Sequence, residues 1–348
     1  MRIRVLVAVT LAARAGSGQA VTPLSCEAVV LPSDSGSGRF VTVAEGPAGR
    51  LAWSDGRPGQ VLVRDGRGTV RVIGRSGDGP GEFRTISAVG WRNDTLWTSD
   101  GRLRRVQFFS DTGRLLSVAT GTPAVVWYPR PDGRLVGFVA QALGSPVVQP
   151  YAVVAQRPGD LHRDTITVFQ RAAVERFALP PTGALNEQPF APRTVVASSA
   201  DASRFCRAHP EESTTLLQCV DDRGRQLFSR PLDFSRRPLT TSVYDSGIAL
   251  FTRAQGRTAD GMRSLVNRPR ELPQVMAMMI DRGGAIWLRR SHEYEPVALW
   301  TRLRPDGALR DEVVIPRRYR ILRPDGDTFW AAQADNDGLE TLYRCRLR

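Results

Sequence analysis

The chain has 348 residues, of which 41% are hydrophobic and 24% charged, and its 32 glycines and 24 prolines are spread along the whole length. This composition excludes a fibrous repeat and a disordered tail, while the length suits one large repeat domain or two ordinary domains. The formal net charge is +13, yet every basic residue is Arg, and the arginines lie beside turns and along alternating stretches without forming a block of like charge. We therefore expect no nucleic-acid binding.

The first twenty residues have the pattern of a secretory signal peptide. A short basic start at 1–4 is followed by an apolar run at 5–13 and by small residues at 17–20, where a signal peptidase would cut. We predict a signal peptide over 1–20 and an exported mature chain, in the periplasm or outside the cell. The alternative is a buried N-terminal strand. Cys26 lies too far beyond the apolar run to predict a lipid anchor. No later stretch is long and apolar enough to predict a transmembrane helix.

An exported chain meets an oxidising compartment, so its four cysteines are expected to form two disulfides. Four cysteines allow three pairings. Cys206 and Cys219 lie symmetrically about a turn-like segment at 209–213, so on an antiparallel hairpin they would face each other within disulfide reach. Cys26 and Cys345 would then pair across almost the whole chain. No CxxC motif occurs and the chain has only three histidines, which argues against a zinc site and predicts no metal.

A recurring unit organises the mature chain: a polar turn with Asp or Gly, an apolar strand that often contains Trp, then a second strand and another turn. Trp53 and Trp97 are 44 residues apart, and Trp287 and Trp330 are 43 apart. This period is typical of one four-stranded propeller blade. We predict an all-β, six-bladed β-propeller of four-stranded antiparallel blades over 21–348, with an irregular or helical insertion around 231–272. A β-sandwich is the structural alternative.

A propeller must close its ring, usually by completing one blade with strands from both ends of the chain. Residues 25–31 and 341–347 are the first and last expected strands of the mature chain. If they pair as neighbours, Cys26 and Cys345 come together, so the cysteine pattern and the repeat support the same ring closure.

Residues 74–84 read GRSGDGPGEFR and are followed by Thr95-Leu96-Trp97 and by the strand 105–109. This resembles the bacterial six-bladed β-propeller family related to NHL repeats, in which a G-x-G-P-G-E-F turn lies between blades. The segments 236–240 and 271–273 are also similar to that family, so the likeness extends over nearly the whole mature chain. The resemblance implies an exported six-bladed propeller, and it implies a fold more than an activity.

The residues of the GPGEF turn have a structural interpretation of their own. The glycines allow a tight turn, the proline stiffens it, the glutamate can accept from turn amides and the phenylalanine can fill the space between blades; these residues are Gly77, Gly79, Pro80, Gly81, Glu82 and Phe83. The functional alternative is a phosphate-binding glycine loop. Pro80 and the strand that follows leave no helix N-terminus for such an anion.

No motif for catalysis stands out. The G-x-S-x-G elbow of serine hydrolases does not occur. Glu293 and Glu295 flank Tyr294, and paired carboxylates can hydrolyse glycosides, but their spacing beside His292 is more typical of a solvated loop. A lactonase-like site would need Glu, Asn and Asp to converge on one metal, and the four asparagines lie in no recognisable motif: Asn93, Asn186, Asn267 and Asn336.

The sequence therefore favours a non-enzymatic binding module for a protein, peptide or glycan, acting as a monomer without a cofactor. The ligand candidates are large or cationic residues in expected loops: Trp127, Tyr128, Arg193, Arg236, Arg237, His292 and Tyr294. Arginine suits recognition of carboxylate or phosphate. The alternative is a metal-dependent hydrolase or lactonase-like enzyme with a divalent cation in the central channel. A third hypothesis is a structural scaffold within an envelope assembly.

Overall fold

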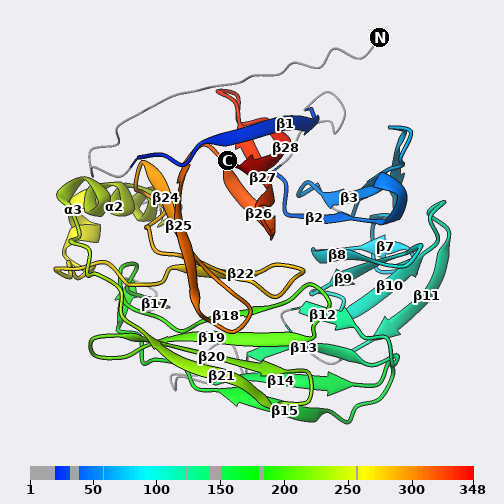
Figure 1. Ribbon diagram of the computed structural model, residues 1–348, viewed down its shortest axis with the longest axis horizontal. Helices are drawn as coiled ribbons and strands as arrows, with labels where there is room; N and C mark the ends of the chain where they lie inside the picture. Colours follow the sequence, from blue (N-terminus) through cyan, green and yellow to red (C-terminus); the bar gives the residue numbers. More distant parts are fainter. Residues whose placement is uncertain are drawn as a thin grey trace.

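The structure is a computed structural model that describes residues 20–31, 39–57, 59–121, 124, 126–140, 150–179, 184–255 and 258–348. The predicted signal peptide lies outside these residues, apart from Ala20, and it stays a prediction. The bulk of the described chain forms six four-stranded antiparallel sheets arranged as the blades of a ring (Figure 1). The predicted six-bladed β-propeller is thereby confirmed.

Each blade is numbered by its place along the ring. Blade 1 contains β2 (Thr42–Glu45), β3 (Leu51–Ser54), β4 (Val61–Arg64) and β5 (Val70–Ile73). Blade 2 contains β8 (Ile86–Arg92), β9 (Thr95–Asp100), β10 (Arg105–Phe109) and β11 (Leu115–Thr120). Blade 3 contains β12 (Val126–Pro129), β13 (Leu135–Ala140), β14 (Tyr151–Gln156) and β15 (Asp164–Phe169).

The second half of the ring repeats this arrangement. Blade 4 contains β18 (Val195–Ser198), β19 (Arg204–Pro210), β20 (Thr215–Asp221) and β21 (Gln226–Leu232). Blade 5 contains β22 (Ala277–Ile280), β23 (Ile286–Arg289), β24 (Val297–Leu303) and β25 (Leu309–Pro316). Blade 6 contains β26 (Arg320–Asp325), β27 (Thr328–Ala334), β28 (Glu340–Leu347) and, from the other end of the chain, β1 (Leu24–Val30).

The repeated tryptophans lie on second strands and fill the space between neighbouring blades. Trp53 of β3 and Trp330 of β27 share one buried cluster at the junction of blades 1 and 6. Trp287 of β23 packs in the cluster between blades 5 and 6, and Trp97 of β9 in the cluster between blades 2 and 3. Second strands such as β3 are buried on both faces because a blade is covered on either side. The 44-residue period therefore arises because each repeated Trp fills the equivalent position between two neighbouring blades.

Ring closure also follows the prediction. In Figure 1, β1 lies beside β28, and Cys26 is the register partner of Cys345. These two cysteines form a disulfide with a Cα–Cα distance of 4.0 Å. Cys206 and Cys219 are likewise directly opposed on β19 and β20 and form the second disulfide, at 4.1 Å between Cα atoms. Two disulfides are typical of proteins from oxidising, extracytoplasmic compartments.

The GPGEF turn connects blade 1 to blade 2 and contains the short parallel pair β6 (Arg75–Ser76) and β7 (Glu82–Phe83). The Glu82 carboxylate accepts from the Gly79 N–H at 2.8 Å and from Arg75 Nε at 2.8 Å. These two bonds, the backbone one first, lower the pKa of Glu82. Phe83 is fully buried in the cluster between blades 1 and 2. The turn thus fastens the two blades together.

Two further elements interrupt the blade pattern. The hairpin β16 (Arg176–Leu179) and β17 (Ala184–Glu187) lies between blades 3 and 4. The helices α2 (Thr241–Gln255) and α3 (Ala259–Arg263) lie between blades 4 and 5, within the expected insertion, and the hydroxyls of Thr240 and Thr258 cap their first turns. A 3-10 turn, η1 (Pro47–Gly49), lies in blade 1. No helix among the described residues has the length and apolarity needed to cross a membrane.

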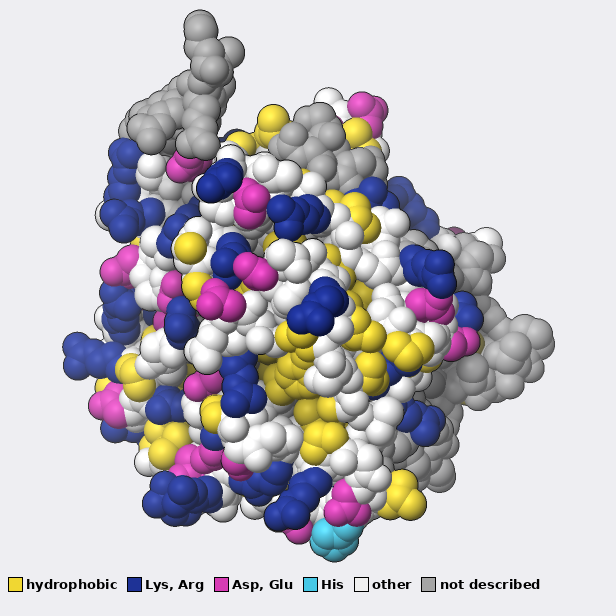
Figure 2. All heavy atoms as spheres, turned by 90° about the vertical axis from the view of Figure 1, so that its right-hand side faces the viewer, with side chains coloured by type: hydrophobic (Ala, Val, Ile, Leu, Met, Phe, Trp, Pro, Cys, Tyr) yellow, Lys and Arg dark blue, Asp and Glu magenta, His cyan; other side chains and the backbone are white. Residues whose placement is uncertain are grey.

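The outer edge of blades 1 and 2 shows apolar side chains between arginines and acidic side chains (Figure 2). The outer strands on this side carry exposed Val72 on β5 and exposed Leu116 and Val118 on β11.

Candidate functional site

The insertions share one end of the ring. Strands alternate in direction within an antiparallel blade, so the connections after the second and fourth strands emerge at one end and those after the first and third at the other. The hairpin β16–β17 and the helices α2 and α3 both follow fourth strands, so they lie at the same end. The loop 290–296, after the second strand of blade 5, is also there.

These elements form a small core of their own, separate from the blade interfaces. Phe177 and Leu179 of β16 are buried together with Val243, Tyr244 and Ile248 of α2. Phe190 lies 5.7 Å from the Tyr244 ring, centroid to centroid, and links the hairpin segment to the helix. The packed unit of hairpin, helices and connecting segments 186–194 and 233–276 is called the insertion cap below.

The structure brings five of the seven ligand candidates to the insertion cap or beside it. Arg193 and Arg236 line the same cavity. Arg237 donates to the Arg290 carbonyl at 2.7 Å and forms an ion pair with Glu295. The rings of His292 and Tyr294 lie 4.6 Å apart. Burial raises the pKa of Tyr294, and the neighbouring Glu293 carboxylate raises it further.

The other two candidates lie apart from the insertion cap. The Trp127 side chain is 1% exposed and packs with Trp97 between blades 2 and 3, so it has almost no surface to offer a ligand. Tyr128 is on β12, the innermost strand of blade 3, and its hydroxyl is hydrogen-bonded to Ser198 of blade 4. Burial raises the pKa of Tyr128.

Glu295 has a structural task. One carboxylate oxygen accepts from the His292 N–H at 2.5 Å and the other pairs with Arg237, so the side chain holds the loop 290–296 against the insertion cap. The expectation of a solvated loop carboxylate is therefore wrong for Glu295, because both of its oxygens have partners within the protein.

Two adjoining cavities open beside the insertion cap. One has a volume of about 470 Å³ and the other about 350 Å³, and their walls share four residues: Pro192, Pro210, Glu211 and Pro269. Together they are called the insertion groove. The larger cavity is also lined by Arg193, Arg236 and Arg270. The smaller one is lined by Glu175 and Glu211 and by no basic residue among those described.

The described part of the chain contains no set of side chains that could hold a metal ion. No three of its His, Cys, Asp and Glu side chains come together as a metal site would require. The asparagines that a lactonase-like site would need are dispersed: Asn93 is in the turn after β8, Asn186 in β17, Asn267 at the insertion groove and Asn336 in the loop after β27.

Comparison with known proteins shows the fold. No family model matches the chain, and no curated protein matches it. Among solved structures, an inferred exported protein of Bacteroides fragilis has a TM-score of 0.55 at 12% identity, covering 93% of this chain and 95% of that one. A DUF4221 family member from Bacteroides vulgatus has a TM-score of 0.51 at 10% identity, with coverages of 90% and 93%. A virginiamycin B lyase from Staphylococcus aureus is similar at 0.44 and 10% identity, covering 93% and 100%.

The protein is thus a six-bladed β-propeller, the fold that its repeat and its GPGEF turn suggested. At these identities, the likeness carries the fold alone, and the function has to be argued from the insertion groove.

Proposed function

We propose that the protein is an exported binding module that holds an extended peptide, or a segment of another protein, in the insertion groove. The observation that supports this most is that the two cavities adjoin beside the insertion cap, with four lining residues in common. Two adjoining cavities can take successive residues of a chain, whereas a compact molecule would fill one of them.

The chemistry of the walls favours a peptide over the other ligands considered. Sites for small molecules are lined mainly by apolar and aromatic side chains, whereas no Phe, Tyr or Trp is among the described residues that line the groove. The same composition offers no aromatic face against which a sugar ring could stack. Four prolines line the groove and give it stiff walls: Pro192, Pro210, Pro269 and Pro273.

The smaller cavity is the more acidic part of the groove. Glu175 and Glu211 line it, with no arginine among the described residues, whereas the larger cavity is lined by three arginines and three glutamates, of which Arg236 and Glu271 pair with each other. A bound peptide would therefore place basic groups toward the smaller cavity. Such an arrangement favours one direction of the bound chain.

The location proposed for this binding is the periplasm or the exterior of the cell, with the protein acting as a monomer. The two disulfides support an oxidising compartment, and the signal pattern of residues 1–20 agrees with it.

Selection of random displayed peptides on the oxidised mature protein tests the proposal. Peptides that are enriched would be measured against the wild type, against Ser213→Trp in the groove wall, and against Ser117→Trp on the exposed outer strand β11 as the matched control. We expect the groove variant to weaken binding by about tenfold or more and the control to leave it unchanged. Equal binding to Ser213→Trp, or enrichment of oligosaccharides in place of peptides on a mixed array, would overturn the proposal.

A further inference from the structure

Buried polar side-chain atoms without a hydrogen-bond partner gather beside the insertion groove. Among the described residues, three such atoms belong to the stretch 289–292 and a fourth to Arg193. They are Arg289 Nε, Arg290 Nε, His292 Nδ1 and Arg193 Nε. Buried donors in native proteins nearly always have partners, and a group of them without any needs an explanation. A charged group from a ligand is one such explanation.

The three arginines differ in what else they contact. Arg290 is an ordinary structural residue, since it pairs with Glu312 at 2.6 Å and donates to the Ser235 carbonyl at 3.1 Å. Arg193 has only a 3.3 Å bond to the Pro189 carbonyl. The Arg289 side chain has neither a hydrogen bond nor an ion pair within the described chain, and burial lowers its pKa. Arg193 and Arg289 are thus guanidinium groups without a carboxylate partner among the described residues.

His292 lies near both arginines. It is 4% exposed, with its ring 5.1 Å from Phe190 and 4.6 Å from Tyr294, centroid to centroid. Burial is the main cause of its lowered pKa. The charges of Glu293 and Glu295 raise that pKa, whereas the positive charges of Arg289 and Arg193 lower it. The two arginines therefore act on the same small volume.

The nearby carboxylates have hydrogen-bond or ion-pair partners other than Arg193 and Arg289. Glu295 is engaged by Arg237 and by the His292 N–H, and Glu293 is hydrogen-bonded to Tyr294. Glu312 is engaged by Arg290 and by the Thr301 hydroxyl. Glu293 and Glu295 still raise the pKa of Arg289 through their charges, although neither forms an ion pair with it. Four arginines thus face three glutamates here: Arg193, Arg237, Arg289, Arg290, Glu293, Glu295 and Glu312.

We propose that Arg193 and Arg289, with His292 between Phe190 and Tyr294 beside them, form an anion site that receives a carboxylate of the peptide bound in the insertion groove. Arg193 itself lines the larger cavity. The Arg289 carbonyl accepts from the N–H of Met276, the residue after Val275 in the cavity wall. A guanidinium binds a carboxylate through two parallel hydrogen bonds, which gives the site its specificity. This inference rests on the proposed function for the identity of the ligand.

The site itself can be tested without a peptide. Thermal melting of the oxidised mature protein would be followed in sodium acetate and sodium succinate, with sodium chloride of equal ionic strength as the reference. We expect a saturable rise in Tm of about 2 °C in the carboxylates, lost in Arg193→Met and Arg289→Met and kept in Arg71→Met, an exposed arginine on β5. Arg289→Lys retains the charge without the planar guanidinium, so it should show a smaller rise in Tm than the wild type. If Arg289→Met does not fold, Arg289→Lys is the variant that tests the site.

Each outcome decides something. No saturable rise, or a rise that both arginine variants retain, overturns the anion site. A larger rise in sodium phosphate than in either carboxylate would overturn the assignment to a carboxylate. Peptides from the display selection would then be compared with their carboxylates free and amidated. If both forms bind equally and Ser213→Trp still weakens binding, the anion site is refuted and the groove function stands. If the carboxylates raise Tm but no peptide is selected, the groove function is refuted and the anion site stands.

Discussion

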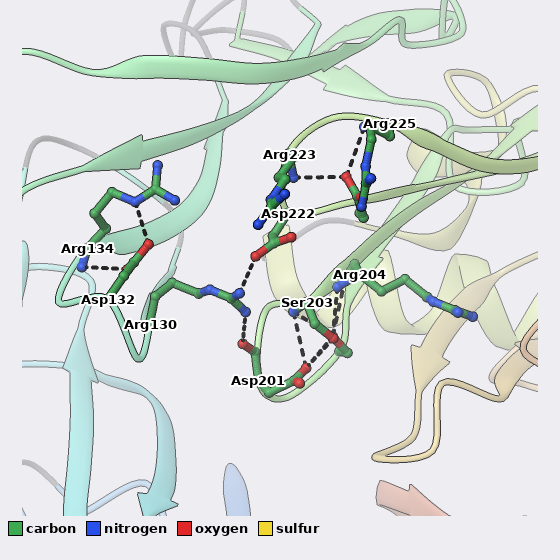
Figure 3. A network of polar contacts seen from close by, with 11 residues as sticks. Arg130, Asp132, Arg134, Asp201, Ser203, Arg204, Asp222, Arg223 and Arg225 are labelled. Atoms are coloured by element: carbon green, nitrogen blue, oxygen red, sulfur yellow. Dashed lines mark hydrogen bonds and ion pairs between the residues drawn. The ribbon is translucent and has the colours of Figure 1, made fainter.

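Arg130 and Asp222 join two neighbouring blades at the end of the ring opposite the insertion cap. Arg130, in the turn after β12, forms an ion pair with Asp222 in the turn after β20, and its other terminal nitrogen donates to the Asp201 carbonyl at 2.8 Å (Figure 3). Both side chains are mostly buried, at 15% and 24% exposed. One arginine thus holds two turns of the next blade.

The same arrangement recurs at every blade interface. In each case an arginine at this end of one blade donates to a carbonyl or carboxylate of the next. The contacts are Arg50 with Asp94 and Asp111, Arg92 with the Arg130 and Pro131 carbonyls, Arg130 with Asp201 and Asp222, Arg204 with the Gly284 and Pro305 carbonyls, Arg302 with Gly326 and Asp327, and Arg344 with Glu45. One arginine at each of the six interfaces therefore helps to hold the ring together.

The Arg130–Asp222 pair should contribute measurably to stability. Urea unfolding of Arg130→Ala, Asp222→Ala and the double variant would give the coupling free energy, which we expect to be about 1–2 kcal/mol because the pair is largely shielded from water. The control is Arg263 with Asp245, which are 45% and 46% exposed and should couple by about 0.5 kcal/mol or less. Equal coupling in the two cycles would contradict the argument.

The disulfide that closes the ring should be worth more than the one inside blade 4. Cys26 and Cys345 are 319 residues apart, whereas Cys206 and Cys219 are 13 apart. Constraining the longer loop removes more entropy from the unfolded chain, so Cys26→Ala with Cys345→Ala should lower the free energy of unfolding by about 5–6 kcal/mol, and Cys206→Ala with Cys219→Ala by about 3 kcal/mol. Denaturant unfolding of both double variants measures the order; a larger loss from the blade 4 pair would refute it.

The blade count was predictable because Trp residues recur at the blade spacing, and one disulfide because Cys206 and Cys219 are symmetric about one turn. The ring closure and the disulfide between Cys26 and Cys345 were predictable because a propeller must join its first and last strands. The hairpin β16–β17 was not predicted, because it adds two short strands to a chain already made of short strands. Only its packing against α2 distinguishes it from a blade.

The candidate site was harder to predict because it depends on contacts between distant segments. Arg193 and His292 were singled out as loop residues, but Arg289 ends a β-strand and looks like any strand arginine. Its lack of a carboxylate partner is visible only once the neighbouring chain is in place. The arginines that join neighbouring blades could not be recognised for the same reason, since their partners lie on the following blade.

Gly81 in the GPGEF turn and Gly74 just before it distinguish the effect of backbone strain from that of packing. Gly74 and Gly81 have nearly the same φ, +80° and +78°. A Cβ at Gly74 would lie 2.3 Å from the Phe83 ring, while one at Gly81 meets nothing within 4 Å. Gly81→Ala should therefore lower the free energy of unfolding by about 1–2 kcal/mol through strain alone, and Gly74→Ala by about 2–4 kcal/mol because Phe83 must also move. Chemical denaturation of both variants checks this, and equal losses would show that Phe83 adapts freely.

Stability should fall between pH 7.5 and 5.5 because two histidines are held neutral in the folded protein. Burial is the main cause of the lowered pKa of His292 and also of His209, whose Nδ1 lies 2.9 Å from the Thr194 hydroxyl. As the pH falls through the ordinary histidine value of 6.5, the unfolded chain binds protons before the folded one does. Protonation then favours unfolding, so the stability contribution is complete above pH 7.5 and is lost on acidification.

The slope of unfolding free energy against pH over this range measures the effect, since carboxylates stay ionised there. His292→Gln should flatten the slope, because the variant has no proton to take up at that position. His162→Gln is the matched control, as His162 is an exposed residue in the turn between β14 and β15. A slope that His292→Gln leaves as steep as in the wild type would show that His292 binds its proton as readily in the folded chain as in the unfolded one, and would contradict the prediction.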